Sequence, residues 1–310
     1  MIAEKLSNKC GFAPTGTAKK ASRYLEIDIL RGIAIVMMVW FHLLFDLNYF
    51  AIAPVDTSAG FWRIFGYTTA VIFVAVAGIS AYISNERAKQ RYSSENNTEN
   101  SNKCLIKSLK RGFFIFLIGV GISIVTFIVI GDGWIVFGIL HLIGLSIMLS
   151  PLFMRFKCYN LIIGAFVIVA GFLIRDFQFN ISQPLLTPLL IPLGITPNNF
   201  YSVDYEPLLP WFGVFLIGIA IAAYLYPRGI RRSGRFSEIA EKLTLTPSEK
   251  VSSDLPSGAD ISVSASKTRM PRRSPAALLV LLGQHSLIIY LIHQPVLILL
   301  LSIFAGHLLL

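Results

Sequence analysis

Residues 31–46 read RGIAIVMMVWFHLLFD, an apolar stretch that carries an arginine, a histidine and an aspartate. In an α-helix that turns about 100° per residue, His42 lies about 20° around the helix from Arg31, and Asp28 and Asp46 each lie about 60° from Arg31. Charged groups are costly in lipid, so this stripe must face the protein interior or a wet cavity. The stripe therefore favours a catalyst or a transporter over a membrane anchor.

The composition of the whole chain agrees with a membrane location for this stretch. The 310 residues are 55% hydrophobic and 14% charged, with a mean hydropathy of +0.67, and long apolar runs recur along the sequence. Such values are typical of integral helical membrane proteins. The chain is predicted to form an all-α polytopic bundle of transmembrane helices.

Seven spans of about 17–23 residues are predicted, since each can cross a hydrocarbon core of roughly 30 Å. Residues 276–284 are apolar but would make the last span too long, so they are predicted to form a short interfacial helix that ends at Gly283, with Ser286 capping the following span. The alternative is one kinked helix with Pro295 at the kink. The predicted spans are 32–53, 61–83, 112–130, 135–154, 159–175, 208–227 and 286–306.

The distribution of Lys and Arg predicts the orientation of these spans. Of the 27 basic residues, only Arg63 and Arg175 fall on the side opposite to all the others. The positive-inside rule then places the N-terminus in the cytoplasm and the C-terminus outside. The net charge of +10 follows from this topology and from attraction to anionic lipid headgroups, so no nucleic-acid partner is expected.

The chain divides into a cytoplasmic tail, residues 1–22, and a transmembrane domain, residues 23–306. Two cytoplasmic segments of that domain, 92–103 and 233–274, are rich in Ser, Asn and charge, and are predicted to be flexible linkers.

His42 and Asp46 are the first candidates for chemistry. A carboxylate four residues after a histidine can hold the imidazole in one tautomer, which suits a general base. The alternative is a structural polar pair between helices. Arg31 at the cytoplasmic end can clamp the phosphates of a cytosolic donor, oriented by Asp28, or it can simply extend to the headgroups.

Further polar residues fall in or near later spans. His141 is placed with His42 and Asp46 in the catalytic group, and His293 with the donor-binding residues, although each taken singly is more often an interhelical hydrogen-bonding group. Asp204 and Glu206 can bind a hydroxyl or amine of an acceptor, or they can simply be solvated, and Trp211 is interpreted as part of an interfacial aromatic belt. Spacings typical of metal ligands, such as HxxxH, are lacking, and no metal is expected.

Five blocks of the sequence, taken in order, resemble bacterial relatives of heparan-α-glucosaminide N-acetyltransferase. They are YLEIDILRGIAIVMMVWFHLLFDL, FVAVAGISAYIS, VFGILHLIGLS, DYEPLLPWFGVFLIG and GQHSLIIYLIHQP. The first block is also similar to membrane acyltransferases that modify surface polysaccharides, whose Arg-x10-His motif matches Arg31 and His42. The resemblance implies that acetyl-CoA is engaged from the cytoplasm by Arg31, and that His42 is the base for acylation of a carbohydrate on the far side.

The resemblance to the lysosomal enzyme has one departure. That enzyme carries its key histidine in the loop after this helix and an asparagine where this chain has His42, and residues 47–60 here contain no histidine. Its N-acetylation of glucosamine is therefore not transferred to this chain.

The leading hypothesis is a multi-pass acyltransferase of the bacterial inner membrane. It would move an acyl group from acetyl-CoA or another acyl-CoA to a hydroxyl or amine of an extracytoplasmic glycan. Lys110 or Arg111 would help Arg31 to hold the donor, and the polar stripe would connect the two sides through one channel. The alternatives are a transporter or proton-relay channel that uses the same residues, and a non-catalytic scaffold. Homodimer formation is left open.

Overall fold

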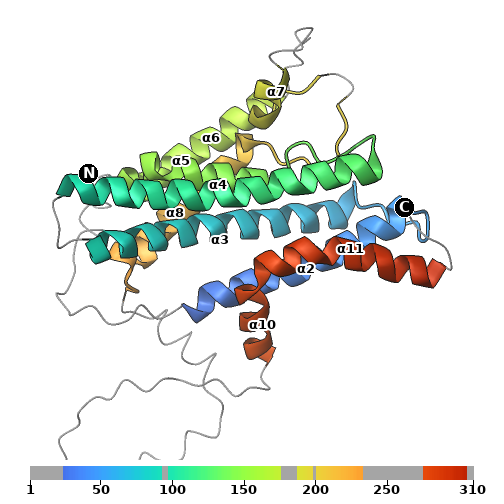
Figure 1. Ribbon diagram of the computed structural model, residues 1–310, viewed down its shortest axis with the longest axis horizontal. Helices are drawn as coiled ribbons and strands as arrows, with labels where there is room; N and C mark the ends of the chain where they lie inside the picture. The colour runs from blue at the N-terminus through green and yellow to red at the C-terminus, as the bar shows by residue number, and fades with distance from the viewer. Residues whose placement is uncertain (1–23, 93–96, 176–186, 198–199, 233–274, 306–310) are drawn as a thin grey trace, which may run out of the picture.

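The computed structural model is a bundle of long helices (Figure 1), and it describes residues 24–92, 97–175, 187–197, 200–232 and 275–305. No strand occurs in these residues, where the one bridge joins Phe137 to Tyr205. The all-α prediction is confirmed. The long helices are α2 Leu25–Tyr49, α3 Gly60–Tyr92, α4 Asn97–Ile130, α5 Ile139–Phe153, α6 Asn160–Arg175, α8 Leu208–Leu225 and α11 Ser286–Ala305.

Shorter elements connect or flank these helices. They are η1 Met154–Tyr159, α7 Thr187–Leu190, η2 Ile191–Leu193, η3 Pro227–Gly229 and α10 Pro275–Gln284.

Six helical stretches of the described residues are long and apolar enough to cross a membrane. One of them, Ile139–Ile174, contains both α5 and α6, which the sequence analysis counted separately. Lys157 in η1 has φ 44° and ψ −118°, so the helical conformation is interrupted between them. The polytopic bundle is thus confirmed, while the count of seven spans and the orientation of the termini stay predictions.

The start of α2 lies beside the ends of α3 and α8. The hydroxyl of Tyr24 donates to the carbonyl of Gly229 at 2.8 Å, and the side-chain amide of Gln90 donates to the carbonyl of Arg228 at 2.6 Å. We call this end of the bundle the basic end, because six basic residues of α2, α3, η3 and the segment just after η3 lie there: Arg31, Arg87, Lys89, Arg228, Arg231 and Arg232. The α2–α3 connection lies at the opposite end (Figure 1).

Glycines allow the closest helix contacts. A Cβ added to Gly112 on α4 would lie 2.6 Å from the carbonyl oxygen of Gly144 on α5, and one added to Gly164 on α6 would lie 2.6 Å from that of Gly213 on α8. Gly218 on α8 similarly lies against the backbone of Ala75 on α3. Small residues at such crossings let backbones approach within membrane bundles. They fix how the helices carrying the polar residues are placed.

The helix before the last span is separate, as predicted. α10 ends at Gln284 and α11 begins at Ser286, and the two helices meet at a sharp angle (Figure 1). α10 crosses α2, because Gly283 lies against the backbone of Asp28 and Gly32 against that of Leu279. This contact places α10 over the basic end of α2.

The linker prediction for residues 92–103 is wrong in part. α3 continues to Tyr92, and α4 begins at Asn97, inside the predicted linker. Extending a helix costs far less than starting one, so the apolar part of α4 carries the helix back into polar sequence. The predicted tail 1–22 and the predicted linker 233–274 lie outside the described residues.

We predict that Gly218→Leu lowers the stability of the bundle by about 1–3 kcal/mol, because the new side chain meets the backbone of α3 and overpacks the contact. Thermal unfolding of the purified protein in detergent measures the change. The matched control is Gly121→Leu, since a Cβ at Gly121 meets no atom within 4 Å. Equal loss of stability in both variants would contradict the packing assigned to Gly218.

Candidate active site

A cavity of about 2530 Å³ lies within the bundle, in the half away from the basic end. Its walls come from α2, α3, α4, α6, α8, α11 and the segment before α8. Most of the wall is apolar, and its ionisable and amide side chains are His42, Asp46, Arg63, Tyr205, Asp204, Glu206, Tyr290, His293 and Gln294, with Tyr49 and Tyr67. The cavity therefore collects residues from both ends of the sequence.

His42 is held in a defined tautomer when neutral. Its Nδ1 lies 2.9 Å from the carbonyl oxygen of Met38, one turn earlier on α2. A carbonyl can only accept, so Nδ1 carries the proton and Nε2 keeps its lone pair. An imidazole with a free Nε2 beside a cavity can accept a proton from a bound group.

His293 on α11 lies directly beside His42. The two ring centroids are 4.9 Å apart with an interplanar angle of 81°. Nδ1 of His293 donates to the carbonyl of Tyr290 at 2.7 Å, while its buried Nε2 has no hydrogen-bond partner among the described residues. The sequence analysis placed His293 with the donor-binding residues near Arg31, but the structure places it with His42.

Asp46 pairs with an amide and not with His42. One carboxylate oxygen accepts a hydrogen bond of 2.6 Å from Nε2 of Gln294, which follows His293 on α11. Asp46 is 2% exposed, and its second oxygen has no partner among the described residues. The expected Asp46–His42 contact is therefore wrong, because Asp46 bonds to Gln294 while the backbone one turn earlier, at Met38, accepts from His42. Sequence reasoning missed Gln294, although an amide next to an intramembrane histidine was a usable signal.

Asp204 and Glu206 reach the cavity from the segment before α8. The backbone N–H of Ile139, the first residue of α5, donates to the carboxyl of Asp204. Burial raises the pKa of Asp204, against the lowering effect of His42 and this hydrogen bond. Burial, reinforced by the charge of Asp204, raises the pKa of Glu206 well above its usual value. The structure brings both acids to the same cavity as His42.

Trp211 belongs to the protein interior. It is 6% exposed, lines the cavity and stacks against Tyr67 with ring centroids 6.2 Å apart. The expectation of an interfacial aromatic belt is thus wrong for this residue, because the segment before α8 folds Trp211 inward against α3.

His141 does not join the catalytic group. Its Nδ1 accepts from the backbone N–H of Gly138 at 3.2 Å, and its Nε2 lies 3.4 Å from the hydroxyl of Ser123. It is 4% exposed and does not line the cavity. His141 therefore caps the start of α5. A polar residue in the first turn of an apolar helix is a sequence signal that could have indicated this role.

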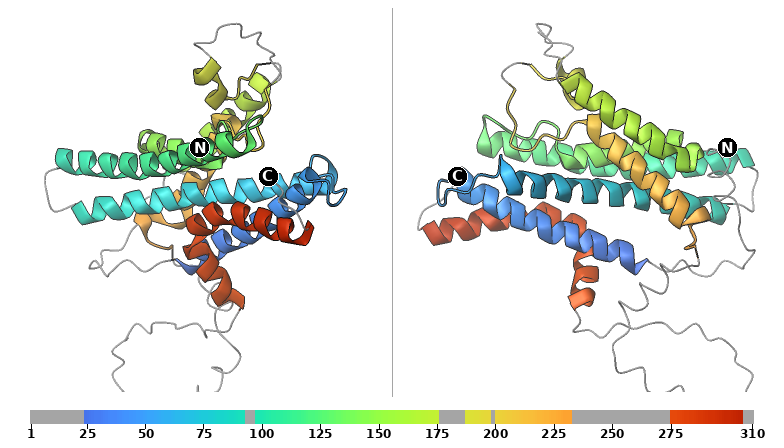
Figure 2. Two further views of the ribbon diagram at one scale, coloured as in Figure 1. Left: turned by 45° about the vertical axis from the view of Figure 1, so that its right-hand side comes forward. Right: turned by 180° about the vertical axis from the view of Figure 1, so that it is seen from behind.

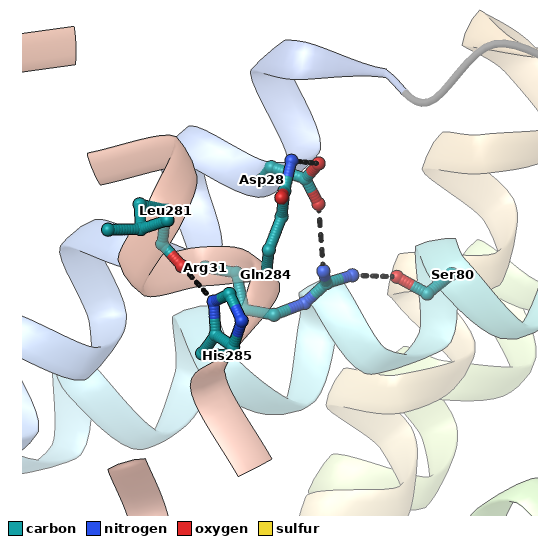
Figure 3. Close-up of polar contacts among 6 residues, drawn as sticks. All are labelled: Asp28, Arg31, Ser80, Leu281, Gln284 and His285. Atoms are coloured by element: carbon teal, nitrogen blue, oxygen red, sulfur yellow. Dashed lines mark hydrogen bonds and ion pairs between the residues drawn. The ribbon is translucent and has the colours of Figure 1, made fainter. Parts of the chain in front are cut away.

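Arg31 forms a second polar cluster at the basic end (Figure 3). Its guanidinium donates to the carboxylate of Asp28 at 3.0 Å and to the hydroxyl of Ser80 on α3 at 2.8 Å. Gln284, at the end of α10, donates to the other oxygen of Asp28 at 3.4 Å. The predicted pairing of Asp28 with Arg31 is confirmed, and three helices hold the arginine in place.

The cavity does not extend to this cluster. Arg31 and His42 are separated by eleven residues, about 16 Å along α2. On α2 the cavity begins at Met38, and Ala34 and Ile35 below it are 0% and 1% exposed. The continuous channel expected from the polar stripe is therefore interrupted here by packed apolar side chains.

Lys110 and Arg111 lie on the part of α4 near the basic end. Both are exposed, and Arg111 is close enough to Arg31 for the two charges to interact. The described residues contain no group of three or more His, Cys, Asp or Glu that could hold a metal ion. Lys110 and Arg111 thus add positive charge near Arg31.

α2 thus contributes to two separate polar groups, the cluster around Arg31 and the cavity that contains His42. The chain matches no curated protein and no solved structure. Residues 23–252 match the catalytic domain described as heparan-alpha-glucosaminide N-acetyltransferase. This match covers most of the chain and includes α2, α3, α4, α5, α6 and α8. The protein therefore belongs to the heparan-alpha-glucosaminide N-acetyltransferase catalytic family of membrane acyltransferases.

Proposed function

We propose that the protein transfers an acetyl group from acetyl-CoA, bound at the basic end, to a hydroxyl or amine of a glycan in the cavity. The family implies a donor of the acyl-CoA class. The observation that carries the proposal is His42, whose Nε2 is free while Nδ1 is bound to Met38. With the basic end in the cytoplasm, the acceptor side is extracytoplasmic, as expected for a bacterial inner-membrane enzyme.

In the proposed reaction, Nε2 of His42 takes the proton from the acceptor as its oxygen or nitrogen attacks the thioester carbon. The bond from that carbon to sulfur breaks, and the proton then passes from His42 to the leaving thiolate. The products are the acylated acceptor and free CoA. His293, beside His42 and with its own Nε2 unpartnered, is placed to share this proton transfer.

Arg31 is proposed to bind the phosphates of the donor. Planar guanidinium groups suit phosphate oxygens, and Asp28 and Ser80 hold this guanidinium in one orientation. Arg111 and Lys110 add positive charge nearby. Because Ala34 and Ile35 close the path, the pantetheine arm must displace packed side chains near Met38 to bring the thioester to His42.

Asp204 and Glu206 are proposed to bind the acceptor. Their raised pKa values favour carboxyl groups that keep their protons, and a protonated carboxyl can both donate to and accept from sugar hydroxyls. Their place in the His42 cavity supports this role.

We predict that His42→Gln lowers kcat/KM by about 10²–10⁴-fold, the usual contribution of a general base, while the Kd for acetyl-CoA stays unchanged. Labelled acetyl-CoA measures transfer and binding separately. The matched control is His285→Gln, because Nδ1 of exposed His285 also contacts the carbonyl four residues earlier but the residue lies outside the cavity. Full transfer activity in His42→Gln would exclude His42 as the base.

We predict that Arg31→Gln raises KM for acetyl-CoA by about 10–100-fold, because charge-assisted hydrogen bonds to phosphate are each worth about 1.5–3 kcal/mol. Asp28→Asn should raise the same KM by less, since Arg31 keeps its charge but loses its ion pair. Steady-state kinetics with the donor and the acceptor varied separately distinguish the two sites. A fall in kcat with unchanged donor KM would contradict the donor role.

A further inference from the structure

An apolar part of the cavity wall comes from α4 and from α6 and α8, two helices that run inclined to α4 (Figure 2). We call this part of the cavity the lateral furrow. The residues of α4 in it recur every three or four positions, so they form one face of the helix. The furrow is lined by Ile118, Gly121, Ile122, Val125 and Val129 of α4, Ile168 and Phe172 of α6, and Val214, Ile217 and Ile221 of α8.

Several of these cavity-lining side chains are also open to the surroundings of the bundle. Val125 is 59% exposed, Val129 50% and Phe172 55%, although all three line the cavity. A Cβ added to Gly121 would meet no atom within 4 Å. Because α4 and α8 are long and apolar enough to cross a membrane, we expect hydrocarbon beside these exposed residues. The furrow thus connects the cavity sideways with the lipid.

The furrow is continuous with the polar part of the site. The same cavity contains His42, Asp204 and Glu206, and its volume of about 2530 Å³ exceeds the roughly 300–1000 Å³ of ordinary small-molecule pockets. There is room for a polar group at His42 and for a chain that extends into the furrow.

The cavity wall also includes one positively charged side chain, toward the end of the bundle opposite the basic end. Arg63 is the only Lys or Arg among the described residues that line the cavity, and its guanidinium lies 5.6 Å from the centre of the Tyr67 ring. α3 runs past α2 so that Gly66 contacts Phe41, which puts Arg63 near the level of His42 and toward the end opposite the basic end. A guanidinium there can bind a phosphate.

We infer that the acceptor is a lipid-linked glycan whose hydrocarbon chain lies in the lateral furrow, whose phosphate binds Arg63 and whose reacting group reaches His42. This inference rests on the proposed acyl transfer. It names the chemical class of the acceptor, which the family and the catalytic residues leave open.

Crosslinking tests the furrow without any acyl transfer. Protein in phosphatidylcholine nanodiscs is irradiated with a single-chain alkyl phosphate that carries a diazirine in the chain. Gly121→Phe should reduce crosslinking to furrow peptides at least 10-fold, because the ring fills the open space at that position. The control is Ile128→Phe, which adds the same ring at a residue of α4 that is 75% exposed and outside the cavity. It should crosslink as wild type does.

The headgroup is tested with a second probe, an alkyl glucoside of equal chain length carrying the same diazirine. Arg63→Gln should weaken crosslinking by the phosphate probe several-fold and leave the glucoside probe unchanged. A diazirine phosphatidylcholine serves as the bulk-lipid reference. If that lipid labels the furrow as strongly as the alkyl phosphate, or if Gly121→Phe and Ile128→Phe behave alike, the furrow holds bilayer lipid only and the inference is overturned.

Activity assays separate this inference from the proposed function. Wild-type protein should acetylate a sugar on an alkyl phosphate at least 10-fold more efficiently than the same free sugar, and Gly121→Phe should remove this preference. Equal use of both acceptors by wild type would overturn the lipid-linked acceptor and leave the acyltransferase intact. If neither acceptor is acetylated but the alkyl phosphate still crosslinks at the furrow, the transfer proposal fails and the lipid site stands.

Discussion

The hydrogen bond from Gln294 to Asp46 ties α11 to α2, across 248 residues of sequence. A carboxylate that is 2% exposed within a membrane helix needs a donor, because lipid offers none. Hydrogen bonds between membrane helices contribute on average only about 0.6 kcal/mol, so this contact selects the register of α11 more than it stabilises the bundle. That register places His293 beside His42 and therefore forms the imidazole pair of the cavity.

A comparable constraint acts at the other end of α2. Arg31 is held by Asp28 of its own helix and Ser80 of α3, while Gln284 of α10 reaches Asp28. α2 therefore carries two polar clusters, each completed by neighbouring helices, with packed apolar residues between them. An acyltransferase that joins two aqueous compartments needs such a barrier, since an open channel would leak ions and hydrolyse the thioester. The interrupted stripe fits transfer of a group better than free passage of a solute.

The fold was largely predictable from sequence, because hydropathy, helix length and basic residues are local signals. The Arg31–Asp28 pair and the break between α10 and α11 were predictable for the same reason. The partners of His42 were not, since a helical wheel shows which residues share a face but not which helix lies opposite. Asp46 lies on the same helix face as His42 but accepts a hydrogen bond from Gln294. His141 is a histidine like His42, but it lies against Ser123 at the start of α5 and not in the cavity. These contacts depend on the tertiary arrangement of helices far apart in sequence.

The backbone of α2 and of α11 determines which ring nitrogen of His42 and His293 carries the proton in the neutral form. Both Nδ1 atoms are engaged by backbone carbonyls of their own helices, so each ring, when neutral, carries its proton on Nδ1. In that form both Nε2 atoms are acceptors, and the two ring centroids lie 4.9 Å apart. No carboxylate is needed to orient either ring, because the helix backbone already fixes both tautomers. Asp46 is left to position α11 through Gln294, and the proposed base function is assigned to imidazoles that the helix backbone orients.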